Sequence, residues 1–339
     1  MNPHATELSR ARIRRAIVVA GPAVALAAAS LLVMPTALAQ AWPTKPIRLV
    51  VPYPPGGNVD VAARIVAPGL EKALGQTVIV ENRAGAGGMI AAEHVARSAP
   101  DGYTFFFTAN GPLLYSPITF GKSNYQWDKD FVPVSSVSFT PLVLQVNSKV
   151  PVRTFRQLLD LVEKQPDKVT MASPGAGTTN HLVSELLQAR TGVRWETVHY
   201  KGNAPATQDL LAGQVQFNFD QVSVSLPYIR DGRLRALAVT TQKRVAALAE
   251  VPTLMELGVA DFTAETFTGI VAPTGTPQPV LDRLQAELAR VLADRGVIDR
   301  FDQLGAEARA MTPGVFATYL RKQYDTWAPV IRKINIQAN

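Results

Sequence analysis

Three short loops of the chain combine glycine with small polar residues, each between an expected strand and an expected helix. They are Pro54-Pro-Gly-Gly-Asn58, Arg83-Ala-Gly-Ala-Gly-Gly88 and Ser173-Pro-Gly-Ala-Gly-Thr-Thr179. Glycine lets the backbone approach a ligand oxygen closely, and the free N–H groups at a helix start attract anions. One helix terminus stabilises an anion by about 0.3–1 kcal/mol, so several must converge to hold a carboxylate. The loops therefore predict an anion site, with ordinary tight turns as the alternative.

Polar residues near these loops are further candidates, and each has a structural alternative. Asp60 either braces a helix start or contacts a ligand, and Asn110 is either a turn residue or a pocket amide. N-capping alone explains one of the hydroxyls at the third loop. The alternative for His181 is packing in the protein, and the alternative for Lys201 is exposure to solvent. The full set of predicted binding residues is Tyr53, Pro54, Gly56, Gly57, Asn58, Asp60, Asn110, Ser173, Gly175, Gly177, Thr178, His181, Tyr200, Lys201, Gly202 and Asp220.

Catalytic and cofactor motifs are incomplete. The run Gly85-Ala-Gly-Gly-Met-Ile90 has isoleucine where a dinucleotide fingerprint needs its third glycine, and no glycine-rich loop ends in Gly-Lys-Ser/Thr. A Gly-x-Ser-x-Gly elbow and a His-x-x-x-His pair are both absent, and the chain has no cysteine. We therefore predict no catalytic residue, metal or cofactor. A hydrolase that uses Ser173 and His181 remains the enzymatic alternative.

Short apolar runs alternate with helical patterns along the chain, which predicts an α/β fold of mainly parallel sheets with helices on their faces. In such sheets the loops at the carboxyl edge are where ligands bind. The expected strands are 47–51, 77–80, 104–108, 142–146, 169–172, 195–198, 215–219 and 234–240. Thr154-x-x-Gln157 is a capping box that opens a helix, and Thr312-Pro313 starts a final helix with Phe316, Leu320 and Trp327 as expected core residues.

The first 39 residues have the pattern of a secretory signal peptide. Arg10, Arg12, Arg14 and Arg15 precede an uncharged stretch over 16–34, and Ala37-Leu-Ala39 offers a cleavage site. A membrane anchor is the alternative, but the clean apolar run 23–34 is shorter than the roughly 20 residues that a span needs. No cysteine follows for a lipid anchor. We therefore expect a product of the periplasm with no stable membrane insertion after cleavage.

The charge and composition of the chain limit the classes of binding partner that it suits. The 339 residues carry 34 basic and 27 acidic groups, and 47% of them are hydrophobic, as in a globular protein. Four of the arginines and one glutamate lie within residues 1–39, so the rest of the chain has 30 basic against 26 acidic groups, a balance of +4. The charges are dispersed, without a basic and aromatic stripe. This pattern argues against nucleic acid as a partner and suits a small anionic ligand without requiring one.

Several motifs occur in one order along the chain. They are Trp42-Pro-x-Lys-Pro-Ile-Arg48, Val51-Pro-Tyr-Pro-Pro-Gly-Gly-x-x-Asp60, Val80-Glu-Asn-Arg-x-Gly-Ala-Gly-Gly88, Ala99-Pro-Asp-Gly-Tyr-Thr104, Ser173-Pro-Gly-x-Gly-Thr-x-x-His181, Tyr200-Lys-Gly202, Asp209-Leu-Leu-x-Gly213, Val251-Pro-Thr253 and Ala272-Pro-x-Gly-Thr-Pro277. Together they resemble the extracytoplasmic solute receptors of the Bug type, the binding components of tripartite tricarboxylate transporters. The resemblance covers essentially all of residues 41–339.

The resemblance implies a two-lobed periplasmic binding protein of type II-like, Venus-flytrap architecture, which closes over a small carboxylate. The implied first lobe comprises 40–141 and 266–339, and the second comprises 142–265. Carried over residue by residue, the carboxylate lies at Pro54, Gly56, Gly57 and Asn58, facing Ser173, Gly177 and Thr178 across the cleft. Many relatives have a hydroxyl residue directly before Asp60, whereas this chain has Val59, so one direct contact is missing.

The implied activity is delivery of an organic acid to the subunits of a membrane transporter. A monomer is the default expectation for a receptor that must dock and release its ligand. A ligand-dependent partner of a membrane sensor is a further alternative with the same fold. Di- and tricarboxylates, acidic amino acids and aromatic acids all remain open as ligands. Tyr53, Tyr115, Trp195 and Phe219 either shape an aromatic slot or pack in the core.

Overall fold

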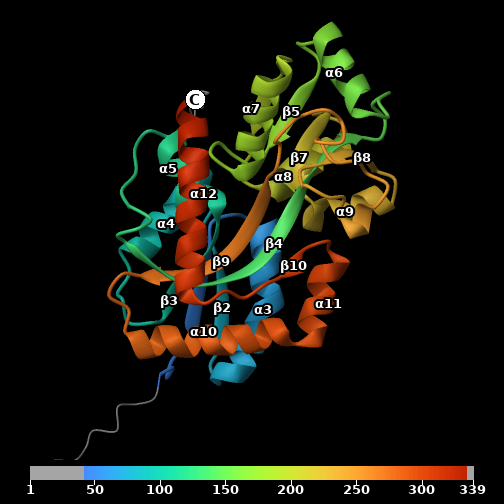
Figure 1. The fold of residues 1–339 in the computed structure, drawn as a ribbon. Helices are drawn as coiled ribbons and strands as arrows, with labels where there is room; N and C mark the ends of the chain where they lie inside the picture. Colours follow the sequence, from blue (N-terminus) through green and yellow to red (C-terminus); the bar gives the residue numbers. More distant parts are fainter. Residues whose placement is uncertain (1–41, 334–339) are drawn as a thin grey trace, which may run out of the picture. The chain divides into compact units, whose positions relative to one another are not determined.

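The fold is that of a computed structural model, which describes residues 42–333. The predicted signal peptide lies outside the described residues. Everything below concerns the compact unit that begins at Pro43. Its strands and helices alternate along most of the chain, as the sequence predicts (Figure 1).

The first sheet has a parallel core of apolar strands. β1 (Ile47–Val51) pairs in parallel with β2 (Val78–Asn82) on one side and β3 (Thr104–Ala109) on the other. β1 and β3 are almost wholly buried, which explains why both read as continuous apolar runs. β9 (Glu265–Pro273) then adds antiparallel to β3, and β4 (Phe131–Asn147) adds antiparallel to β9. The short β10 (Glu307–Ala308) pairs with β4.

The second sheet repeats the design. β5 (Thr170–Ser173) pairs in parallel with β6 (Glu196–His199) and β7 (Phe217–Gln221). The end of β4 adds antiparallel to β7, and β8 (Leu234–Val239) adds antiparallel to β4. The pairs among β1, β2 and β3 and the pairs among β5, β6 and β7 are thus parallel. Every pair that involves β4 or β9 is antiparallel.

The two sheets are joined by β4, which is 17 residues long. β4 pairs with β9 as far as Pro141, and from Leu142 onward it pairs with β7 and β8. The sequence predicts only the part over 142–146, because the preceding half carries the polar residues Ser135, Ser136, Ser138 and Thr140, which the structure buries. The result is a two-lobed fold; the lobe boundaries after residues 141 and 265 stay a prediction.

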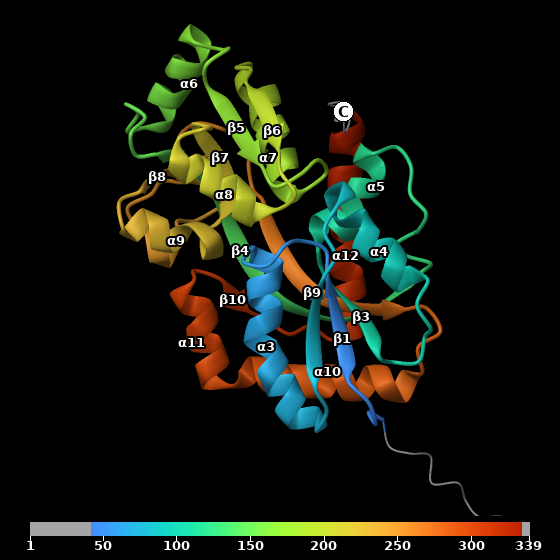
Figure 2. The same ribbon diagram turned by 180° about the vertical axis from the view of Figure 1, so that it is seen from behind.

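Helices cover both sheets (Figure 2). They are α3 (Asn58–Leu74), α4 (Met89–Ala96), α5 (Ser116–Thr119), α6 (Phe155–Lys164), α7 (Thr179–Thr191), α8 (Asn203–Ala212), α9 (Val222–Arg230), α10 (Gln278–Ala293), α11 (Arg295–Gln303) and α12 (Pro313–Lys333). The sequence does not predict α9, whose alternating Val and Ser residues and internal Pro227 are poor helix signals. None of the described helices is long and apolar enough to cross a membrane.

Local signals set several helix ends, and the final helix supplies core contacts. The Thr154 hydroxyl accepts a hydrogen bond from the Gln157 N–H, which confirms the cap that opens α6. Phe316, Leu320 and Trp327 of α12 are buried, as predicted. The ring of Phe316 meets that of Phe267 edge-on at 5.5 Å between centroids, so α12 packs against β9 of the first sheet.

Candidate functional site

The glycine loops of the two lobes meet around one small cavity. Its volume is about 20 Å³, which is room for a single water molecule. Loops that follow β1, β3, β5 and β6 contribute, together with the last residue of β7, because the carboxyl ends of these strands face the same gap between the sheets. The lining residues are Tyr53, Asn58, Val59, Ala109, Gly111, Pro174, Thr178, Thr179, Asn180, Asn203, Gln221 and Thr266. The lining contains neither a cationic nor an anionic side chain.

Three helices begin beside this cavity. Gly57 caps α3 and Gly202 caps α8, and neither helix start has a side-chain cap. The first helical bond recorded for α3 runs from the Val61 N–H to the Gly57 carbonyl, so the N–H groups of its first turn have no helical acceptor. Thr178 caps α7 by accepting from the His181 N–H. Helix N-termini from both lobes therefore make the cavity favourable for an anion.

Glycines form the contact between the lobes. A β-carbon at Gly57 would lie 3.1 Å from Asn203 Oδ1, and one at Gly202 would lie 2.7 Å from Pro54 Cδ. A β-carbon at Gly177 would lie 2.8 Å from Ser116 Cα in the first lobe. Real β-carbons essentially never come within 3.0 Å of other atoms, and a contact of 3.1 Å is tighter than most. The lobes are therefore closed on each other, and the absence of side chains at these positions permits it.

Gly177→Ala is expected to lower ligand affinity at least about 10-fold, because the new methyl group meets Ser116 and holds the lobes apart. Gly177 has a φ of +74°, so alanine also strains the backbone, by about 1 kcal/mol. Gly192→Ala is the matched control: its φ is +77°, but nothing lies within 4 Å of its β-carbon position. Calorimetric titration and thermal unfolding of both variants separate the two effects. Equal affinity losses in the two variants would contradict this role for Gly177.

Asp60 holds the first loop from within its own lobe. Its buried carboxylate accepts from the Gly56 N–H at 2.9 Å, from Arg64 Nε at 3.0 Å and from Asn82 Nδ2 at 2.8 Å. Burial acts to raise the pKa of Asp60, but the hydrogen bonds from Arg64, Gly56 and Asn82 outweigh it and lower that pKa. Asp60 does not line the cavity, so the geometry fits the bracing role. Asn82, which the sequence analysis missed, also donates to the Tyr53 carbonyl at 2.8 Å.

Ser173 and His181 support the third loop rather than each other. Ser173 Oγ accepts from the Gly175 N–H at 3.3 Å and donates to the Gly175 carbonyl at 3.2 Å. His181 Nδ1 accepts from the Gly177 N–H at 3.2 Å. Burial, together with the nearby His199, lowers the pKa of His181 to about 3, so the 3.8 Å contact of its Nε2 with Glu185 is not an ion pair at neutral pH. This geometry lends no support to the hydrolase alternative.

Asp220 anchors a buried polar network in the second lobe. Its carboxylate accepts from Asn203 Nδ2 at 2.5 Å, Thr207 Oγ1 at 2.9 Å and the Gln221 N–H at 2.8 Å. Burial raises the pKa of Asp220 to about 6, although these hydrogen bonds oppose the shift. The carboxylate thus orients the amide of Asn203, which does line the cavity.

The wall opposite the first loop consists of residues that the sequence analysis did not select. Gln221 Nε2 donates to Asn180 Oδ1 at 3.0 Å and to Thr266 Oγ1 at 2.9 Å, and Asn203 Nδ2 also donates to Gln221 Oε1 at 2.7 Å. Asn203 directly follows the predicted Gly202, and Gln221 directly follows the predicted Asp220. Asn203 and Gln221 could therefore have been found from their positions next to predicted loop residues. Nothing in the sequence pointed to Thr266.

The other predicted residues lie at varied distances from the cavity. Tyr53, Asn58 and Thr178 line it, and Pro54, Gly56, Gly57, Gly177 and Gly202 lie at the contact between the lobes. Asn110 is buried and binds the Phe267 N–H at 2.9 Å, which ties it to β9. Tyr200 donates to Asp209, Gly175 faces the Tyr200 carbonyl, and Lys201 is exposed.

Of the four aromatic residues considered for an aromatic slot, one lines the cavity. Tyr53 lines the cavity, and burial raises its pKa, which keeps the phenol a hydrogen-bond donor. Trp195 packs edge-on against Phe217 at 5.4 Å, and Tyr115 packs against Trp327 at 5.9 Å. Within residues 42–333, no group of three or more acidic, histidine or cysteine residues is placed to hold a metal ion.

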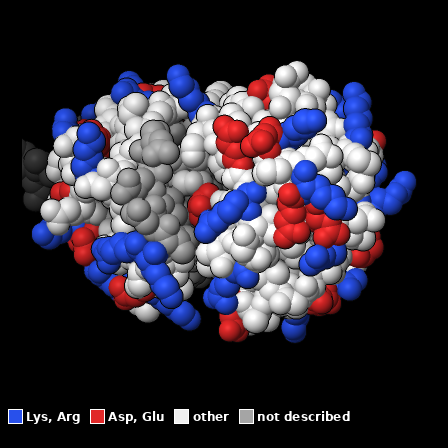
Figure 3. All heavy atoms as spheres, turned by 90° about the horizontal axis from the view of Figure 1, so that it is seen from above, with Lys and Arg blue, Asp and Glu red and all other residues white. Residues whose placement is uncertain are grey.

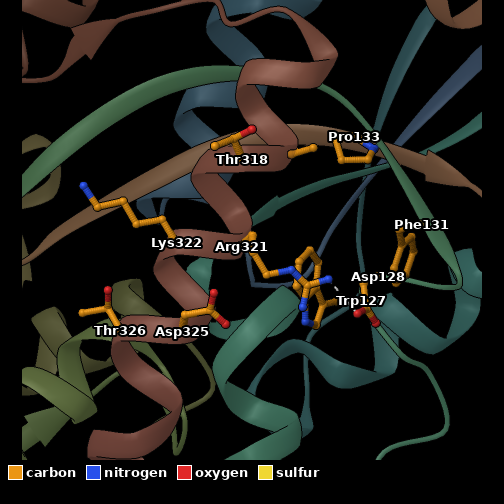
Figure 4. A pocket seen from close by; sticks show the side chains of 10 residues that line it. Trp127, Asp128, Phe131, Pro133, Thr318, Arg321, Lys322, Asp325 and Thr326 are labelled. Carbon is orange, nitrogen blue, oxygen red and sulfur yellow. Dashed lines mark hydrogen bonds and ion pairs between the residues drawn. The ribbon is translucent and has the colours of Figure 1, made fainter.

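A larger hollow of about 760 Å³ lies along α12 (Figure 4), and no residue of the glycine loops lines it. Arg321 stacks on Trp127 at 4.5 Å and donates to Asp128 at 2.9 Å, so its guanidinium is already paired. The hollow is open and is lined by the start of β4, the residues before it and α12. It has no contribution from the helix starts, which favours the smaller cavity as the ligand site.

Two sheets joined by crossing strands, with glycine loops closed over a polar cavity, define the class of two-lobed periplasmic binding proteins. The chain belongs to the tripartite tricarboxylate transporter receptor family, whose profile matches residues 62–336. The family confirms the resemblance that the loop motifs predict.

Relatives and solved structures agree with this assignment. The chain is 38% identical over 330 residues to a protein encoded between tcbD and tcbE in Pseudomonas sp. strain P51, covering 97% of each chain. It is 36% identical to the BugT protein of Bordetella pertussis, covering 87% of this chain and 91% of BugT. A Rhodopseudomonas palustris protein solved with adipate is 32% identical, with a TM-score of 0.84, over 87% of this chain and 99% of that one. MatC of the same species, solved with bound malate, is 32% identical, with a TM-score of 0.82, over 86% of this chain and all of MatC.

Proposed function

We propose that the protein captures a small organic acid between its lobes in the periplasm and delivers it to a membrane transporter, without chemical conversion. The observation that carries the proposal is the convergence of helix starts from both lobes on one closed cavity with a neutral polar lining. Related proteins of the same fold were solved with adipate and with malate, both dicarboxylates. We therefore assign dicarboxylates as the ligand class.

A neutral lining is suited to a ligand that must be released again. Backbone N–H groups at the starts of α3 and α8 supply partial positive charge, and amides and hydroxyls supply directed hydrogen bonds. The site therefore holds a carboxylate without forming an ion pair. On the visible face of Figure 3, basic and acidic side chains are interspersed over the described residues, which suits docking to a protein partner more than a polyanion.

Closure of the two lobes links ligand binding to delivery of the ligand to the transporter. The cavity of about 20 Å³ is far smaller than the 300–1,000 Å³ of typical ligand sites, so a dicarboxylate enters only when the lobes separate. The two lobes, which we assign to 40–141 with 266–339 and to 142–265, are connected by the crossing strands β4 and β9. A ligand that contacts both lobes stabilises a form in which the lobes close around it over the open form, and the transporter then recognises that ligand-bound form.

The proposal predicts a large thermal shift with the correct acid. The protein is unfolded and refolded to remove any carried ligand, then melted with succinate, malate, adipate, aspartate and citrate in turn. A ligand at a hundred times its Kd adds about 2.7 kcal/mol of stability, which raises the melting temperature by about 5 °C in a chain of this size. The absence of a shift with every acid, together with no acid released from the protein as purified, would contradict the proposal.

A further inference from the structure

A hollow of about 360 Å³ lies where the two lobes join, and no residue of the glycine loops lines it. It is lined by 240–242 and 263–265, which we assign to the second lobe, and by residues of α12 between Lys322 and Trp327. Glu265 and Thr266 are neighbours at the start of β9, and successive side chains of a strand point to opposite faces. Thr266 lines the cavity of the glycine loops, whereas Glu265 lines this hollow. The start of β9 therefore separates the two spaces, and we call the second one the hinge hollow.

Glu265 lies at the crossing of the two connecting strands. It pairs with Pro141 of β4, and from Leu142 onward β4 leaves β9 and pairs with β7. The residue before Glu265 is tied to the second lobe, because the Ala264 N–H donates to the Thr240 carbonyl at 2.9 Å. Separation of the lobes must bend the chain at this crossing, so it moves Glu265 relative to the first lobe.

Tyr319 of α12 faces the same crossing from the first lobe. Its ring meets that of Phe139 at 5.3 Å and that of Phe267 at 5.6 Å, both edge-on, so α12 packs on β4 and β9 (Figure 1). Phe267 is two residues from Glu265 and therefore on the same face of β9. Gln323, one turn after Tyr319 on α12, lines the hinge hollow together with Glu265. Tyr319 and Glu265 are thus neighbours on the side of β9 that faces α12.

Both polar groups lack a hydrogen-bond partner in this closed form. The Tyr319 hydroxyl is a buried donor without an acceptor, and the Glu265 carboxylate has no hydrogen bond or ion pair within residues 42–333. Burial and the nearby Glu265 raise the pKa of Tyr319, and burial raises the pKa of Glu265. Arg309 is committed elsewhere, since it donates to Glu307 at 2.8 Å and stacks on Phe139 at 4.0 Å. A buried donor without an acceptor destabilises the form in which it occurs.

We propose that the hinge hollow narrows when the lobes separate, so that Glu265 accepts a hydrogen bond from Tyr319 and holds the ligand-free protein open. Two spaces on opposite sides of one hinge change in opposite directions, so widening the cavity of the glycine loops narrows the hollow behind it. Lys322 also lines the hollow, but it is exposed, and ion pairs of exposed side chains contribute little. The inference rests on the proposed function in one respect: the ligand stabilises a form in which the lobes close around it. Binding must then break this bond, which lowers the affinity.

Tyr319→Phe removes the hydroxyl and keeps the ring. The full-length expressed protein is unfolded and refolded to remove carried ligand, then titrated calorimetrically with succinate, malate and adipate. Tyr319→Phe should raise the affinity about 10-fold, as expected for one hydrogen bond to a charged group, although Tyr319 does not line the cavity of the glycine loops. Tyr324→Phe is the matched control on the same helix, because the Tyr324 hydroxyl accepts only a long bond from Arg332. It should change the affinity less than about 2-fold.

Glu265→Gln exchanges the carboxylate for a neutral amide that still has an acceptor oxygen. We therefore expect a smaller gain in affinity, of about 3-fold. The double variant of Glu265→Gln and Tyr319→Phe should gain no more than Tyr319→Phe alone, because both substitutions act on one bond, whereas the effects of independent sites would multiply. Melting temperatures without ligand show whether each variant is folded.

Thr263→Trp tests the narrowing of the hollow without changing either partner of the bond. Thr263 is exposed and lines the hinge hollow, so an indole there fills space that must be given up when the lobes separate. The open form is then overpacked, and the affinity should rise at least about 5-fold. Thr318→Trp is the control, because Thr318 is exposed and lines the larger hollow along α12, to which only the first lobe contributes. It should leave the affinity unchanged.

Small-angle X-ray scattering of the ligand-free proteins gives a second measurement, which needs no acid. Tyr319→Phe and Thr263→Trp should each have a smaller radius of gyration than the wild type, because more of the protein is closed. If no acid binds but both variants are more compact, the inference holds and the dicarboxylate function fails.

The opposite result overturns the inference alone. If an acid binds and both variants keep the affinity and the radius of gyration of the wild type, no bond at the hinge holds the protein open, although the proposed function stands. A loss of affinity in Tyr319→Phe would show that the hydroxyl stabilises the closed form instead, which also contradicts the inference. If no acid binds and neither variant is more compact, both proposals fail.

Discussion

Gly57→Asp is expected to abolish ligand binding, by at least about 1,000-fold, while the protein stays folded. Gly57 caps α3 beside the cavity with a φ of −84°, a conformation open to any residue, and aspartate is among the preferred N-cap residues. The folded state therefore loses little or nothing. The new carboxylate, however, lies where the proposed ligand carboxylate binds, and two like charges in a buried site repel strongly. Calorimetric titration with the acid found in the thermal screen measures the loss.

Size and charge are separated by Gly57→Asn, which has the same shape and the same capping ability without the charge. A β-carbon at this position already meets Asn203 Oδ1 at 3.1 Å, so the asparagine variant should lose part of the affinity by opposing closure. The aspartate variant should lose at least 10-fold more. Equal affinities of the two variants would show that no ligand charge lies near the start of α3, and unchanged affinity in both would refute the site.

Acidification is expected to destabilise the protein through His181. Its pKa is lowered from 6.5 to about 3 by burial and by His199, so the unfolded chain binds the proton more readily than the folded one. The stability that this neutral histidine contributes is complete above about pH 6.5 and is lost as the pH falls toward 3. At pH 4.5 the loss amounts to about 2 to 3 kcal/mol. Urea unfolding at pH 7 and pH 4.5 measures it directly.

His181→Gln should remove most of this pH dependence, because glutamine keeps a hydrogen-bond acceptor near the Gly177 N–H but does not titrate. His94→Gln is the control: the pKa of His94 is also lowered by burial, but its side chain is less buried, and its charged neighbours are Arg83, Glu81 and Arg48. Asp220 acts in the opposite direction, because its raised pKa of about 6 makes the folded chain bind a proton more readily. If His181→Gln loses as much stability on acidification as the wild type, His181 is not the group responsible.

Local patterns predicted the parts of the fold that depend on neighbouring residues. β1 lies at 47–51 as expected, and the strand expected at 234–240 is β8 (Leu234–Val239). α7 begins after its Thr178 cap, and α3 ends at Gly75, whose φ of +69° suits glycine. These features are set by hydrophobic periodicity and by bonds between residues a few positions apart, which can be read directly from the chain. By contrast, α9 has poor local signals, and its place in the structure is set by packing in the second lobe.

The order of strands and helices, the three glycine loops and membership in a receptor family could be predicted from the chain, because each of these depends on residues close together in it. Which side chains face the cavity depends on the tertiary structure. Asn58 and Ser223 are 165 positions apart, and Gln221 and Thr266 are 45 apart. These pairs meet because β4 and β9 cross between the lobes, and a contact over such separations leaves no periodicity in the sequence. Asp60 and Asn110 are conspicuous in the sequence, yet the structure turns both toward the protein rather than the cavity, since their polar atoms satisfy neighbouring backbone groups.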